Sequence, residues 1–240
     1  MTDSAPASPA AEAGGNIELL EALRRVLIRS AIVAVVFAAG GYYIAEPVLV
    51  RLQAMTGVEM VAYGLPDAFF SMLKMALAMG LVAGMPYTFY GLLSILPRFF
   101  PGFRRRLLFG FWIAAVLLFA GGIFFCLKVT LPYGIKFLLG YESQHIAALI
   151  SVKRFVSFCL WMFLGFGLIF ELPLAMILLA RIGLVKARQL AGYRRYAVLV
   201  IFIVAAVLTP TPDVLNMTLM AAPLYLLFEI GLLGMRFWSS

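Results

Sequence analysis

The sequence is poor in the residues that carry most enzyme chemistry. Its 240 residues include one histidine, two cysteines and only 12% charged side chains. No His/Cys/Asp cluster has metal-ligand spacing, and no glycine-rich loop indicates a phosphate site. No GxSxG motif accompanies the lone His145, and no other nucleophile–base pair is visible. These absences predict a protein that is not an enzyme and that holds no metal or cofactor.

The start of the chain lacks the features of a secretory signal. Residues 1–15 are rich in Ala, Pro, Ser and Gly, with two acids and no Lys or Arg. A signal peptide would have a basic start followed directly by an apolar core. We therefore expect residues 1–15 to form a disordered cytoplasmic tail. Cys126 and Cys159 both fall in or beside apolar segments, which favours packing roles over a disulfide.

Apolar residues, in contrast, are abundant. The chain is 64% hydrophobic, with a mean hydropathy of +1.03. A soluble domain of this size could not bury so much apolar surface, whereas a membrane-spanning helix needs about 20 mostly apolar residues. The pattern predicts an all-α, polytopic membrane protein with no internal repeat. Residues 16–240 would form one transmembrane domain of six helices, at about 26–44, 69–93, 107–127, 155–182, 196–208 and 215–237.

Basic residues predict the orientation. If the six spans place both ends of the chain on one side, that side carries most of the 19 Lys and Arg residues. Basic loops stay in the cytoplasm, so both termini are expected there. The formal charge of +8 is then explained by topology, with anionic lipid headgroups as the counter-charge. A nucleic-acid partner is a poor explanation, because the bases gather at helix ends.

The fifth apolar block is unusually short. Residues 196–208 would make a helix of about 20 Å, against a hydrocarbon core of about 30 Å. Two explanations stay open at this point. Either the ends of the helix are misplaced, or the short helix thins the bilayer where a large polar cargo crosses.

Acidic residues interrupt the apolar segments at a few points. Glu171 lies in "FGLIFELPLAMILL", two residues before Pro173, and Glu229 lies in the sixth block. A charged group within a span is costly and usually faces a cavity or a partner. Glu171 could form a polar contact surface inside the membrane, or its carboxyl could tie two helices of the bundle together. The prolines favour kinked helices and a concave bundle.

Several motifs together resemble the TatC family, the receptor component of twin-arginine, Sec-independent protein translocases. They are "LLEALRRVLIRS" before the first span, "FELP" in the fourth, "LTPTPD" between the fifth and sixth, and "PLYLLFEIG" in the sixth. The resemblance covers about residues 20–231. It implies a receptor in the bacterial cytoplasmic (inner) membrane that binds twin-arginine signal peptides of folded precursors. It also implies several copies in a hetero-oligomer with single-span partners of the TatA and TatB type, and export driven by the proton-motive force.

The resemblance also assigns roles to particular residues. Signal-peptide binding would fall to Glu18, Glu21, Arg24 and Arg105, and docking within the membrane to Glu171, Pro86 and Glu229. Asp213, Pro47 and Phe69 would lie at the outer mouth of the bundle.

Two departures from the family pattern concern signal reading. The histidine that usually opens the first motif is missing, and its acid is shifted by one place to Glu21. In the first cytoplasmic loop, Phe103 stands where the family has an acid. An alternative function is a proton-coupled transporter of small solutes, with Glu171 and Glu229 as the titrating groups.

Overall fold

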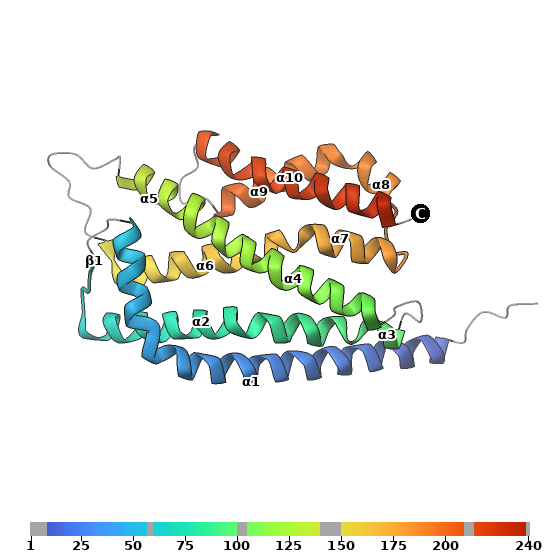
Figure 1. The fold of residues 1–240 in the computed structure, drawn as a ribbon, viewed down its shortest axis with the longest axis horizontal. Helices are drawn as coiled ribbons and strands as arrows, with labels where there is room; N and C mark the ends of the chain where they lie inside the picture. The colour runs from blue at the N-terminus through green and yellow to red at the C-terminus, as the bar shows by residue number, and fades with distance from the viewer. Residues whose placement is uncertain (1–8, 57–59, 100–104, 140–149, 209–213, 239–240) are drawn as a thin grey trace, which may run out of the picture.

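The computed structural model describes residues 9–56, 60–99, 105–139, 150–208 and 214–238. Nearly all of these residues are helical (Figure 1). The elements are α1 (Pro9–Thr56), β1 (Met60–Val61), α2 (Leu65–Leu93), α3 (Leu96–Phe99), α4 (Arg105–Phe125), the π-helical η1 (Cys126–Thr130), α5 (Leu131–Leu139), β2 (Ile150–Ser151), α6 (Val152–Phe170), α7 (Leu172–Arg181), α8 (Ala187–Gly192), α9 (Arg194–Leu208) and α10 (Val214–Trp238).

The long helices form an elongated bundle. Figure 1 shows α1 and α2 along one edge, α9 and α10 along the other, and α4 crossing α6 and α7 between them. The start of α1, α3, α8 and the end of α10 all lie at one end of the bundle, which we call the terminal end. The connections that hold β1 and β2 lie at the opposite end. Both described ends of the chain are therefore on the same side of the bundle.

Five segments in the described residues are long and apolar enough to cross a membrane. They match five of the six predicted spans and cover 17–54, 66–93, 106–135, 152–181 and 220–237. The exception is the predicted fifth span, which is α9. With 15 residues, α9 is about 22 Å long and is shorter than a bilayer core requires. Within the described residues, the short fifth block therefore corresponds to a short helix.

Two expectations about helix ends need correction. Helix α1 begins at Pro9, inside the stretch expected to be a disordered tail; residues 1–8 are not described. Proline is tolerated in the first helical turn, and the alanines that follow are strong helix formers. The helix also continues to Thr56, well past the predicted end of the first span, and its last part, which contains Pro47, turns away from α2 toward α5. Proline removes a helical hydrogen bond and permits such a bend.

Small residues let α1 and α2 approach closely. Gly80 on α2 has no room for a side chain, because a Cβ there would collide with the backbone of Ala34 and Ala38 on α1. A Cβ on Gly91, further along α2, would meet the side chain of Val26 at 2.7 Å. Small residues one helical turn apart allow this kind of backbone contact between membrane helices, where dispersion replaces the hydrophobic effect.

The main core lies where α6, α7, α9 and α10 meet. Phe166, Met162, Leu232 and Met235 are almost fully buried there. Cys126 belongs to the same core and Cys159 to a neighbouring one, and both are free thiols, as the sequence predicted. At the end opposite the termini, a short parallel pairing of β1 with β2 links two distant connections of the chain.

Candidate functional site

Two of the predicted signal-peptide residues line one groove at the terminal end. The groove has a volume of about 310 Å³ and is formed by the start of α1 and the end of α2. We call it the terminal groove; it is lined by Glu18, Glu21, Ala22, Arg25, Val26, Arg29, Ser94 and Ile95. Glu18, Glu21, Arg25 and Arg29 recur at helical spacing, so one face of α1 carries two carboxylates followed by two guanidiniums.

These charges are available to a ligand. None of the four side chains forms an ion pair with another described residue, and all four are exposed. Carboxylates bind an incoming guanidinium through paired hydrogen bonds. Arg24, which was predicted to contribute, is exposed on α1 and is not one of the residues that line the groove. Arg105 begins α4, and its side chain is outside the described part of the structure, as are Phe103 and its loop.

Glu171 lies at the junction between α6 and α7. Pro173 lacks the N–H that would continue the α6 ladder, so the long fourth span is divided into two helices that meet at this glutamate. Its Oε1 atom is buried and has no hydrogen-bond partner among the described residues. The carboxyl faces the backbone of Phe119 on α4. A buried polar atom without a partner is costly, so Oε1 is left for a polar group from outside the described residues.

Glu229, in contrast, is already engaged. One oxygen accepts a hydrogen bond from Nη2 of Arg194 at 2.8 Å, and the other accepts one from the hydroxyl of Tyr225 at 3.0 Å. Arg194 is the first residue of α9. Glu229 therefore connects α9 to α10. A carboxyl that ties two helices together was one of the two alternatives for Glu171, and the structure shows this arrangement at Glu229.

The remaining predicted residues are dispersed. The carbonyl of Pro86, inside α2, accepts a hydrogen bond from the indole of Trp112 on α4 at 2.8 Å. Phe69 opens α2, is 55% exposed and packs edge-on against Phe70. Pro47 is exposed near the end of α1. Asp213 falls outside the described residues. Phe69 and Pro47 both belong to the end of the bundle opposite the termini.

A small apolar groove runs between α9 and α10. Its volume is about 250 Å³, and its walls are Val198, Ile201, Phe202, Thr218, Ala221, Ala222 and Tyr225. Exposed apolar side chains continue the surface along α9, including Leu199, Val200 and Ile203. This is a surface that another apolar helix could cover.

The arrangement agrees with one family of membrane proteins. Residues 18–223 match the family model of TatC, the Sec-independent protein translocase protein. This chain belongs to the TatC family. The match begins at Glu18, the first carboxylate of the terminal groove, and ends within α10.

Individual TatC proteins agree with this assignment. The TatC of Carboxydothermus hydrogenoformans is 33% identical over 223 residues, which is 92% of each chain. The TatC of Desulforapulum autotrophicum is 38% identical over 187 residues, covering 77% of this chain and 68% of its own. A crystal structure of the twin-arginine translocase receptor TatC superposes with a TM-score of 0.79 at 29% identity, covering 92% of this chain and all of the other.

Family membership places the chain in protein transport. TatC is the receptor component of the twin-arginine translocase and not an enzyme. The fold is that of TatC, an all-α polytopic membrane protein. Of the residues that line the terminal groove, the sequence analysis named Glu18 and Glu21 but did not name Arg25, Arg29 and Ser94. The helical spacing of the arginines was a visible signal, whereas Ser94 is brought to the groove only by the packing of α2 on α1.

Proposed function

We propose that this TatC chain reads signal peptides through the terminal groove. The observation that carries the proposal is the pair Glu18 and Glu21, two exposed carboxylates without an ion-pair partner in the described structure, in one groove at the end where the chain begins and ends. An Arg-Arg motif would present two guanidiniums, and each carboxylate can accept paired hydrogen bonds from one of them. Arg25 and Arg29 would favour acidic or neutral residues next to the motif.

We further propose that the terminal end faces the cytoplasm of a bacterium, with the protein in its inner membrane. The support is the excess of Lys and Arg in the chain ends and connecting loops that the six-span arrangement places on the side of the termini. Helix α9 would be a sixth, short span. Its length of about 22 Å would be accommodated by local thinning of the bilayer. A thinner bilayer shortens the hydrocarbon layer that a folded, polar cargo must cross.

Docking of small single-span partners, of the TatA and TatB type, would use the membrane-facing side. The α9–α10 groove offers an apolar surface for a partner helix, and the unpartnered oxygen of Glu171 offers a polar contact. Several copies of each protein would then form the translocase, with transport driven by the proton-motive force. In this arrangement Glu229 positions α9 rather than contacting the partner.

The transporter alternative is less well supported. It requires Glu171 and Glu229 as a pair of titrating groups in one pathway. Glu229 is held by Arg194 and Tyr225, and neither glutamate lines the terminal groove or the α9–α10 groove. Purified alone in liposomes, the chain should move no small solute.

Signal reading is tested by site-specific crosslinking. A photo-crosslinker is placed beside the motif of an Arg-Arg signal peptide and, as a control, beside the same peptide with Lys-Lys. Both are offered to inner membranes that contain this chain. We expect crosslinks from the Arg-Arg peptide to residues 18–29 and 94–95, and few from the Lys-Lys peptide. Equal crosslinking of the two peptides would contradict twin-arginine reading by this groove.

A further inference from the structure

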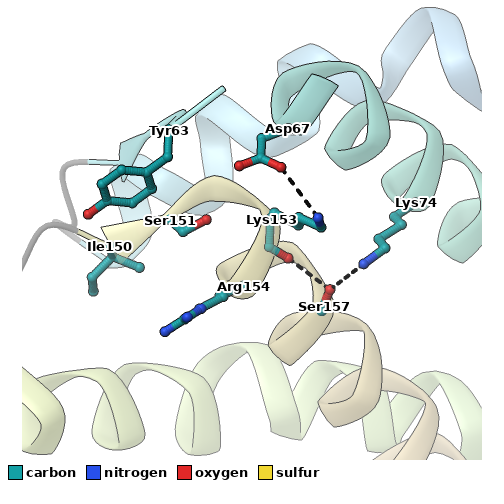
Figure 2. A pocket seen from close by; sticks show the side chains of 8 residues that line it. All are labelled: Tyr63, Asp67, Lys74, Ile150, Ser151, Lys153, Arg154 and Ser157. Carbon is teal, nitrogen blue, oxygen red and sulfur yellow. Dashed lines mark hydrogen bonds and ion pairs between the residues drawn. The ribbon is translucent and has the colours of Figure 1, made fainter. Parts of the chain in front are cut away.

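A second, larger cavity lies at the end of the bundle opposite the terminal groove. Its volume is about 910 Å³, and its walls come from the start of α2, from β2 and from the first turns of α6. We call it the basic cavity; Figure 2 shows its lining residues, Tyr63, Asp67, Lys74, Ile150, Ser151, Lys153, Arg154 and Ser157. The signal-reading proposal does not involve it.

The charges of the described residues that line this cavity do not balance. Three cations, Lys74, Lys153 and Arg154, face one carboxylate, Asp67. Asp67 forms an ion pair with Lys153, with Oδ1 and Nζ 3.4 Å apart. In the described parts of the chain, neither Lys74 nor Arg154 has an acidic partner. Two positive charges are therefore left for a ligand.

Lys74 is the more informative of the two. It lies inside the second membrane segment, 66–93, and is half-buried. Its ammonium donates a hydrogen bond to Oγ of Ser157 at 2.9 Å, and that hydroxyl donates in turn to the carbonyl of Lys153 at 2.8 Å. Both acceptors are neutral, so the lysine is held in place without a counter-charge. A cation within a span normally has an anionic partner or faces a water-filled cavity.

Arg154 completes the basic side of the cavity. Figure 2 shows its guanidinium extending from the first turn of α6, with no dashed interaction to any other side chain drawn. Its planar group binds two oxygens of a phosphate at once. The hydrogen bonds through Ser157 tie the ammonium of Lys74, which comes from α2, to the first turns of α6. The guanidinium of Arg154 extends from the same turns of α6 and away from Lys74, so the two cations line different parts of the cavity wall (Figure 2).

We propose that the basic cavity binds the phosphodiester of an anionic phospholipid. The level of the cavity in the bundle supports a lipid source for the phosphate. Two membrane segments begin at its walls, one at Pro66 and one at Val152, and headgroup phosphates lie where spanning helices enter the bilayer. Lys74 reaches this level from within the span, as long basic side chains do near helix ends. Such a lipid would hold α2 and α6 together at this end.

The test measures lipid-dependent stability of the purified full-length chain. Its thermal unfolding midpoint is recorded in detergent during titration with phosphatidylglycerol or with zwitterionic phosphatidylcholine. We expect phosphatidylglycerol to raise the midpoint at lower concentrations than phosphatidylcholine. Lys74→Gln keeps a donor for Ser157 but removes the charge, and Arg154→Gln removes the second charge. Each should raise the half-saturating phosphatidylglycerol concentration about fivefold, the effect of one basic residue near an anionic surface.

Matched controls separate a site from general charge attraction. Lys128→Gln and Arg51→Gln remove the same charges from exposed residues that do not line the cavity, and both should titrate like the unchanged protein. If the controls shift as much as the cavity variants, only diffuse attraction exists and the site is overturned. Equal responses to both lipids would also overturn it, because the two cations would then be neutralised within the chain.

A final arm distinguishes the two sources of phosphate. Inorganic phosphate and glycerol phosphate are titrated in place of lipid. We expect neither to raise the midpoint at millimolar concentration, because they lack the acyl chains that hold the headgroup at the cavity. A shift equal to that of phosphatidylglycerol, lost in Lys74→Gln, would assign the cavity to a soluble anion and would overturn the lipid proposal.

Discussion

The guanidinium of Arg194 and the carboxylate of Glu229 lie 2.8 Å apart and join the first residue of α9 to the second half of α10. The side chains are 45% and 27% exposed. Helix α9 is too short to be held by the bilayer alone, so a polar connection at its first residue fixes where it begins. The carboxylate of Glu229, which the sequence predicted as a docking group, is thus engaged within the chain by Arg194 and Tyr225.

Removing this ion pair should have a small and specific effect. Glu229→Gln should lower the free energy of unfolding by at most about 1 kcal/mol, because both groups are partly exposed. Arg194→Gln should have a similar effect, and the double variant should cost less than the sum. The measurement is a double-mutant cycle by thermal denaturation in detergent. Arg195→Gln, next in sequence and stacked on Tyr196, should show no coupling to Glu229→Gln; coupling of equal size would contradict the specific pair.

The close approach of α1 and α2 should tolerate no added methyl group at Gly80. Gly80→Ala would collide with the backbone of α1 and should destabilise the protein by about 1–3 kcal/mol. Gly110→Ala is the matched control, because nothing lies within 4 Å of a Cβ at that position on α4. It should be neutral or slightly stabilising, as alanine is favoured in helices. Similar unfolding midpoints for both variants would show that the helices do not pack this closely.

Glu171 should be needed for transport but not for stability. Its Oε1 atom is buried without a hydrogen bond in the described chain, so Glu171→Leu should leave the thermal midpoint unchanged or raise it. The same variant should reduce export of a twin-arginine reporter and crosslinking to single-span partners. Glu171→Gln, which keeps polarity, should retain more activity than Glu171→Leu. If both variants exported normally and only the midpoint fell, Glu171 would be a packing residue.

The two carboxylates of the terminal groove should not contribute equally to signal reading. Glu21→Ala should weaken signal-peptide binding more than Glu18→Ala. The reason is that Glu21 lies one place from the position where the first TatC motif usually has its acid. Binding of an Arg-Arg peptide to the purified protein measures both. Arg188→Ala, which lies in α8 at the same end of the bundle but lines a different cavity, is the control and should bind nearly normally. Equal and negligible losses for both glutamates would contradict the assignment.

The apolar pattern of the sequence was sufficient to identify the membrane class and the helices. Hydropathy depends on local composition, so five of the predicted spans overlap the five candidate spans in the described residues. The break in the fourth span also follows locally, because Pro173 removes one helical hydrogen bond. Helix ends were less predictable. The start of α1 at Pro9 and its continuation to Thr56 were missed, because polar or mixed residues extend a helix beyond its apolar part.

By itself, the sequence determined the class and the family and drew attention to the two carboxylates at the start of α1, since these depend on residues that are neighbours in the chain. Only the tertiary structure decided which charges have partners. It joined Arg194 to Glu229 across 35 positions and Lys74 to Ser157 across 83, and it left an oxygen of Glu171 without a partner. Charges are neutralised by groups that are near in space, and in a helical bundle those groups come from different helices.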